Sequence, residues 1–192
     1  MAFVAFLDTC VLYPPTLRDV LLTISEAGVC QIRWSSDVLD ELQRILAERA
    51  DAPSSETAKA GARYLRNTME DSFPDALVDR RLYEKLITAM QNDSGDRHVL
   101  AAAIAGRADV LVTSNVRHFP RDTVPDTLQI QDPDTFLCFQ FELSPGAILE
   151  TLEMLSHERH IPLDSVDGII RKLRFIAPRF SERALSVWHG RT

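Results

Sequence analysis

The sequence of 192 residues lacks long hydrophobic runs and has few cysteines. No stretch approaches the roughly 20 apolar residues that a membrane-spanning helix needs. Residues 1–9 also lack the basic start and long apolar core of a secretion signal. We therefore expect a cytoplasmic protein with no membrane partner. The three cysteines, Cys10, Cys30 and Cys138, match neither a disulfide framework nor a zinc motif, which favours reduced, buried thiols.

Positive charge is also scarce, since 21 Lys and Arg face 28 Asp and Glu, for a formal net charge of −7. This balance ordinarily argues against nucleic acid binding, because phosphate is bound by Lys and Arg. The charge is uneven, however, because residues 168–192 contain a single acid, Glu182. The basic residues of this tail are Arg171, Lys172, Arg174, Arg179, Arg183 and Arg191. No glycine-rich triphosphate-binding loop is present.

Short apolar runs alternate with amphipathic stretches, which predicts an α/β fold with a central parallel sheet flanked by helices. We expect a domain over residues 1–142 and a helical C-terminal extension with a basic tail over residues 143–192. The expected strands cover residues 3–7, 29–34, 109–113 and 128–131. The expected helices cover residues 14–28, 35–48, 56–70, 79–90, 96–106, 133–139, 144–158 and 162–176.

Three carboxylates are placed where an α/β sheet binds its ligands, beyond the carboxyl ends of the strands. Asp8 directly follows the first expected strand, although an Asp there can equally cap the next turn. Glu41 lies at the edge of the buried face of its helix, whereas Asp40 falls on the opposite, solvated side. Asp96 projects onto the apolar face of its helix, and Asp93 is the expected cap.

A polar segment, Thr113 to Asn115, follows the third expected strand at the same edge. Asn115 can offer a carbonyl oxygen to a metal or orient a water together with Thr113, although a plain polar turn is the alternative. Carboxylates without His or Cys ligands favour a hard cation, Mg²⁺ or Mn²⁺. Two such ions about 4 Å apart can activate water and stabilise the leaving oxygen in phosphodiester cleavage.

Four blocks of sequence, FLDTCVLYPP, WSSDVLDEL, DSGDRHVLAAA and LVTSNVRHFP, resemble the motifs of PIN-domain proteins in the same order, over about residues 3–140. The resemblance is nearest to the VapC-like toxins of bacterial toxin–antitoxin pairs. It implies a PIN-like three-layer fold and a Mg²⁺- or Mn²⁺-dependent endoribonuclease that is held inactive by a cognate antitoxin. It also implies that the chain can form a homodimer.

Within this resemblance, the first acid of the family corresponds to Asp8, the helical Glu to Glu41 and the third acid to Asp96. These residues are the expected metal ligands and, with Asn115 and Thr113, the expected catalytic residues. The fourth family position is often Asp but is Asn115 here. That departure leaves one metal ion or two as alternatives.

RNA binding requires positive charge around an acidic pocket. Four residues lie close to the motif blocks: Arg18, Arg97, Arg117 and His118. We expect them to rim the cleft, with a solvated or salt-bridged surface role as the alternative for each. The basic tail is expected to support RNA or antitoxin binding, or else only to brace the domain.

Two other functions fit the same residues: a catalytically weak PIN scaffold that acts by RNA or protein binding, and a housekeeping RNA-processing nuclease. A phosphatase of the haloacid-dehalogenase type needs a second Asp two residues after the first, and Cys10 occupies that position.

Overall fold

A computed structural model describes residues 3–50, 53, 55–158 and 165–191. Contacts divide the chain into two compact units: Met1–Tyr13 with Gln31–Ile130, and Pro14–Cys30 with Gln131–Thr192. The expected domain boundary after residue 142 stays a prediction. No helix within the described residues is long and apolar enough to cross a membrane.

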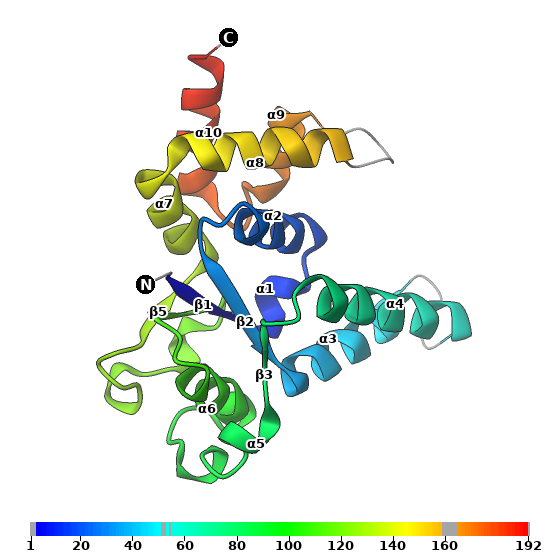
Figure 1. Ribbon diagram of the computed structural model, residues 1–192, viewed down its shortest axis with the longest axis vertical. Helices are drawn as coiled ribbons and strands as arrows, with labels where there is room; N and C mark the ends of the chain where they lie inside the picture. The colour runs from blue at the N-terminus through cyan, green and yellow to red at the C-terminus, as the bar shows by residue number, and fades with distance from the viewer. Residues whose placement is uncertain (1–2, 51–52, 54, 159–164, 192) are drawn as a thin grey trace. The chain divides into compact units, whose positions relative to one another are not determined.

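The first unit is built on a sheet with the strand order β3-β2-β1-β4-β5 (Figure 1). The strands are β1 (Val4–Leu7), β2 (Gln31–Ser35), β3 (Leu77–Val78), β4 (Val110–Val112) and β5 (Gln129–Gln131). The pairs β1–β2, β1–β4 and β2–β3 are parallel. Phe6 of β1 pairs with Leu111 of β4, and both are fully buried. Continuous apolar runs suit such strands because helices cover the faces of parallel sheets.

The helices of the first unit flank this sheet, which confirms the expected α/β class (Figure 1). They are α1 (Thr9–Leu12), α3 (Ser36–Glu48), α4 (Glu56–Ser72), α5 (Arg80–Tyr83) and α6 (Arg97–Ala105). Helix α3 begins where it was expected, because the Ser35 side chain accepts a hydrogen bond from the Val38 amide. The two-residue strand β3 was not predicted, since so short a strand leaves no periodic pattern.

The helix expected over residues 79–90 is wrong. Helix α5 stops at Tyr83, and only a 3-10 turn, Ile87–Ala89, follows it. Tyr83 is fully buried and its hydroxyl donates a 2.6 Å hydrogen bond to Asp37 of α3. We attribute the interruption to this long-range anchor, because tertiary contacts override helix propensity.

The second unit consists of helices α2 (Pro15–Glu26), α7 (Pro133–Leu143), α8 (Pro145–Glu158), α9 (Val166–Leu173) and α10 (Pro178–His189) (Figure 1). Helix α2 packs against α8 and α9, and α7 packs against α10. The helix expected over residues 162–176 is shorter, since Ser165 caps α9 and the helix ends at Leu173. Residues 162–164 lie outside the described residues. Helix α10 was not predicted, although Pro178 is at its first turn.

Three of the six basic residues of the tail form ion pairs within this unit. Arg179 contacts Asp134 at 2.8 Å, Arg183 pairs with Glu142, and Arg171 lies 3.4 Å from Asp167. Two of the apolar tail residues differ sharply, because Phe180 is fully buried whereas Phe175 is 94% exposed. Such pairs are what the bracing alternative predicts for the tail.

Asp134 is the main polar link between α7 and α10, and its removal should destabilise the second unit. Its carboxylate is 6% exposed and accepts a 2.8 Å hydrogen bond from the Phe180 amide as well as the Arg179 contact. Asp134→Ala leaves that buried amide unsatisfied, which should cost about 1–3 kcal/mol of unfolding free energy. Urea unfolding at pH 7 measures this cost.

The matched control is Asp126→Ala, because Asp126 is fully exposed and pairs with Arg121 at 2.6 Å. Exposed pairs contribute about 0–1 kcal/mol, so little change is expected. Equal stability of the two variants would show that Asp134 is not a structural link.

Candidate functional site

Asp8 is the most deeply buried acid near the carboxyl ends of the strands, with 3% exposure. It caps α1 by accepting a 2.7 Å hydrogen bond from the Thr9 amide, which confirms the capping role that the sequence left as an alternative. Its second oxygen accepts hydrogen bonds from the Thr113 hydroxyl at 2.7 Å and the Cys10 thiol at 3.1 Å. Burial raises the pKa of Asp8, and the negative charge of Asp96 raises it further, against the lowering effect of the hydrogen bonds.

A cavity of about 250 Å³ opens at this carboxylate, within the first unit. It brings together four of the five expected catalytic residues, and Thr113 reaches it through its hydrogen bond to Asp8. The oxygen ligands expected from the sequence therefore share one cavity. Its lining consists of Asp8, Thr9, Cys10, Tyr13, Glu41, Ile45, Arg49, Asp96 and Asn115.

Glu41 enters the cavity from α3, at the edge of the buried helical face. The Thr9 hydroxyl donates a 2.8 Å hydrogen bond to it, and Arg44 lies 3.9 Å away. Its neighbour Asp40 points elsewhere, with a side chain that is 62% exposed and paired with Arg66. The helical spacing predicts this difference, because adjacent residues are about 100° apart around the axis.

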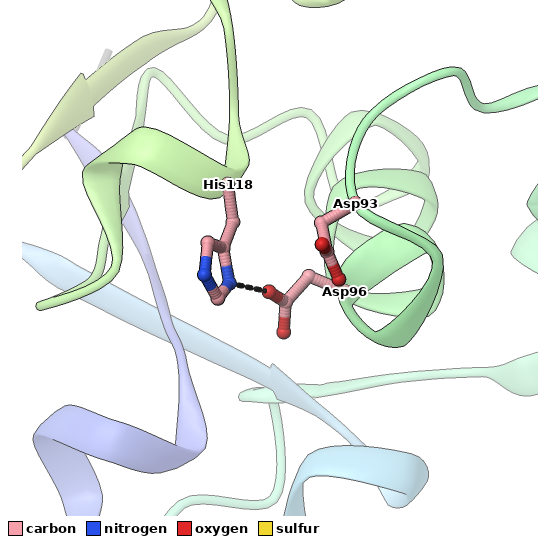
Figure 2. A group of neighbouring side chains, drawn as sticks. All are labelled: Asp93, Asp96 and His118. Carbon is pink, nitrogen blue, oxygen red and sulfur yellow. Dashed lines mark hydrogen bonds and ion pairs between the residues drawn. The ribbon is translucent and has the colours of Figure 1, made fainter.

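Asp96 reaches the cavity from the turn before α6, where Asp93 is the cap and accepts a 3.0 Å hydrogen bond from the Gly95 amide. One oxygen of Asp96 lies 2.6 Å from Nδ1 of His118 (Figure 2). His118 therefore contacts one acid of the site, Asp96.

Cys10 lines the cavity. The sequence did not predict this, and the only signal was the position of Cys10 two residues after Asp8. Its sulfur accepts a 3.1 Å hydrogen bond from the Ser114 amide. Burial, reinforced by the charge of Asp8, raises the pKa of Cys10 to about 12. The thiol therefore stays protonated at neutral pH and acts as a hydrogen-bond donor to Asp8.

The basic residues are placed differently from one another. Arg18 is buried and lies 3.6 Å from Asp19, in the second unit, which matches the salt-bridged alternative. Arg97 is half-buried and contacts the carbonyl of Asn92, whereas Arg117 is exposed.

The cation that lines the cavity is Arg49, which sequence reasoning missed. Its guanidinium lies 5.3 Å from the centre of the Tyr13 ring, and no ion pair holds it among the described residues. Arg49 follows the end of α3, outside the four motif blocks, so no sequence signal singled it out.

The donor set fits a hard divalent cation. Asp8, Glu41 and Asp96 offer carboxylate oxygens, and Asn115 offers an amide oxygen, which are the ligands that Mg²⁺ and Mn²⁺ take. Burial of the Asp8 carboxylate beside the negative charge of Asp96 is unfavourable without a counter-ion, as its raised pKa shows.

The sequence of the chain is similar to known proteins. A protein of Mycobacterium tuberculosis named "Putative ribonuclease VapC50" is 50% identical over 80 residues, which are 40% of this chain and 47% of that protein. The match thus spans about half of the length of this curated relative. No solved structure matches the chain. The model of the PIN domain matches residues 4–117, which include Asp8, Glu41, Asp96 and Asn115, and the chain therefore belongs to the PIN-domain family.

Proposed function

We propose that the chain is a divalent-metal-dependent endoribonuclease that hydrolyses RNA phosphodiester bonds, and that it is the toxin of a toxin–antitoxin pair. The observation that carries the activity is the cavity in which Asp8, Glu41 and Asp96 converge on one edge of the sheet. The name of the mycobacterial relative supports ribonuclease chemistry, and the resemblance of the motif blocks to VapC-like toxins supports the toxin assignment.

The expected catalytic residues have distinct tasks in this proposal. Asp8, Glu41 and Asp96 hold Mg²⁺ or Mn²⁺, and Asn115 adds a neutral oxygen. The Thr113 hydroxyl orients the Asp8 carboxylate and accepts a 3.0 Å hydrogen bond from the backbone amide of Asn115. Thr113 therefore links the two ligand residues. When bound, the cation supplies positive charge that stabilises the transition state and lowers the pKa of the attacking water.

RNA is proposed to enter beside Arg49 and Tyr13, since both line the cavity and the guanidinium is free to meet phosphate. Arg49→Gln should raise KM with little change in kcat, and should reduce the slope of log Kd against log salt by roughly one. Fluorescence anisotropy with a labelled single-stranded RNA measures the slope.

Arg121→Gln is the control, because Arg121 is exposed and pairs with Asp126 away from the cavity. An unchanged salt slope in the Arg49 variant would move the RNA path elsewhere, for example to Arg97 and Arg117.

The test of the activity is metal-dependent RNA cleavage by the full chain. Protein stripped with EDTA should leave a mixed pool of structured and unstructured RNA intact, and added Mg²⁺ or Mn²⁺ should restore endonucleolytic cuts. Failure to cut any RNA with either ion, while RNA still binds, would favour the alternative of a scaffold that acts by binding.

The toxin assignment needs a different experiment. Co-expression with the product of an adjacent small reading frame should suppress cleavage and yield a complex that co-purifies. Cleavage that no neighbouring product inhibits would favour a housekeeping RNA-processing nuclease. A cytoplasmic location and a homodimer remain proposals of the same kind.

A further inference from the structure

A second cluster of metal-binding atoms lies beside the cavity, at the turns that contain Asp93, Asp96 and His118. One ligand atom from each residue lies within 4.8 Å of the other two. Figure 2 shows the imidazole of His118 facing the Asp96 carboxylate, with Asp93 next to it. The His118 nitrogen makes this a mixed nitrogen and oxygen set, unlike the all-oxygen cavity.

A backbone hydrogen bond holds these two turns together. The Asp93 amide donates a 3.1 Å hydrogen bond to the His118 carbonyl, so the turn before α6 is fixed to the turn after β4. The Asp93 and His118 side chains are thus brought together by a contact that spans residues distant in sequence. A site formed on such a fixed frame needs little rearrangement to bind.

A second observation at the same turn is an orphaned buried amide. Asn92, the residue before Asp93, is 4% exposed, and neither its side-chain oxygen nor its nitrogen has a hydrogen-bond partner within the described part of the chain. Buried polar groups nearly always have partners, which include ordered water and ions. The Asn92 side chain can therefore bind a further ligand at this turn.

We infer that Asp93, Asp96 and His118 form a second cation site that selects Mn²⁺ over Mg²⁺ and takes the place of the acid missing at Asn115. Imidazole nitrogen is a good ligand for first-row transition ions and a poor one for Mg²⁺. Asp96 belongs to both clusters, so its two oxygens can serve an ion on either side.

The ion would occupy the place of the hydrogen bond between Asp96 and His118. Nδ1 of His118 offers its lone pair to the ion when it carries no proton, and the carboxylates of Asp93 and Asp96 supply negative charge. This inference rests on the proposed function for the role of the ion in cleavage. The binding of the ion is measurable without RNA.

Electron spin-echo envelope modulation of protein loaded with Mn²⁺ tests the site directly. The wild-type protein should show ¹⁴N coupling to Mn²⁺ that persists in excess Mg²⁺, and His118→Gln should abolish it. Asp93→Asn keeps the oxygen that accepts from the Gly95 amide but loses the negative charge. It should lower the affinity of this site for Mn²⁺ at least about tenfold.

His157→Gln is the control, because His157 is exposed on α8 in the second unit. Absence of ¹⁴N coupling in the wild type, or its survival in His118→Gln, would overturn the inference. Nitrogen-bound Mn²⁺ in a protein that cuts no RNA would keep the site and refute the proposed function. Metal-dependent cleavage without ¹⁴N coupling would do the reverse.

Discussion

Glu41→Gln protein is expected to cut RNA about a thousandfold more slowly than wild type, whereas Asp40→Asn protein cuts at the normal rate. The two acids are adjacent on α3, but only Glu41 lines the cavity. Loss of one carboxylate ligand removes several kcal/mol of transition-state stabilisation, and about 4 kcal/mol corresponds to this factor. Single-turnover cleavage in saturating Mn²⁺ separates the chemical step from RNA binding.

The comparison is sharp because the two variants carry the same change in net charge. Asp40→Asn loses only an exposed ion pair with Arg66, which contributes little to stability. Circular dichroism checks that both variants are folded. Equal rates for Glu41→Gln and wild type would remove Glu41 from the catalytic residues.

Asp8→Asn protein should be inactive and yet more stable than wild type when no metal is present. Burial and the charge of Asp96 raise the pKa of Asp8 in the folded protein. The ionised carboxylate therefore opposes folding above the pKa of about 3.9 that an Asp has in the unfolded chain. The gain in unfolding free energy should be absent near pH 3 and should grow as the pH rises from there to pH 7.

The Asn side chain can keep two of the three hydrogen bonds that Asp8 accepts, and it loses only the one from the Cys10 thiol, which is a weak donor. Its oxygen can still accept from the Thr9 amide, and its NH₂ can donate to the Thr113 hydroxyl, with the direction of that bond reversed. Packing should therefore change little, and the difference reports the charge.

Added Mn²⁺ should reverse the order of stability. A ligand at a hundred times its Kd stabilises the folded protein by about 2.7 kcal/mol, and the wild type should gain this much while the variant gains little. Urea unfolding from pH 3 to pH 8, in EDTA and in Mn²⁺, measures both effects. A metal-free Asp8→Asn protein that is no more stable than wild type at pH 7 would contradict the electrostatic account of the cavity.

The sequence predicted the elements whose signal is local. Apolar runs marked the four longer strands, and Ser35 marked the start of α3. Asp8 could be placed because a residue after a parallel strand lies at the ligand-binding edge of the sheet. Glu41 could be separated from Asp40 because the helical period alone decides which one faces inward.

The structure alone revealed the features that depend on residues distant in sequence. Helix α5 stops at Tyr83, whose hydroxyl donates a hydrogen bond to the distant Asp37, so the helical pattern of residues 79–90 was misleading. Helix α2 lies in the contact unit of the C-terminal helices, although it follows the first motif block. Local pattern carries no information on such packing.

The same distinction applies to the site. The sequence by itself determined which carboxylates and which amide are available, because residue type and position on an element fix the donor atoms. Only the tertiary structure decided that Arg49 lines the cavity and that Arg18 is buried, since both depend on how elements pack. It also placed His118 next to Asp96. A backbone hydrogen bond between Asp93 and His118 brings together two turns that are distant in sequence, which no local pattern predicts.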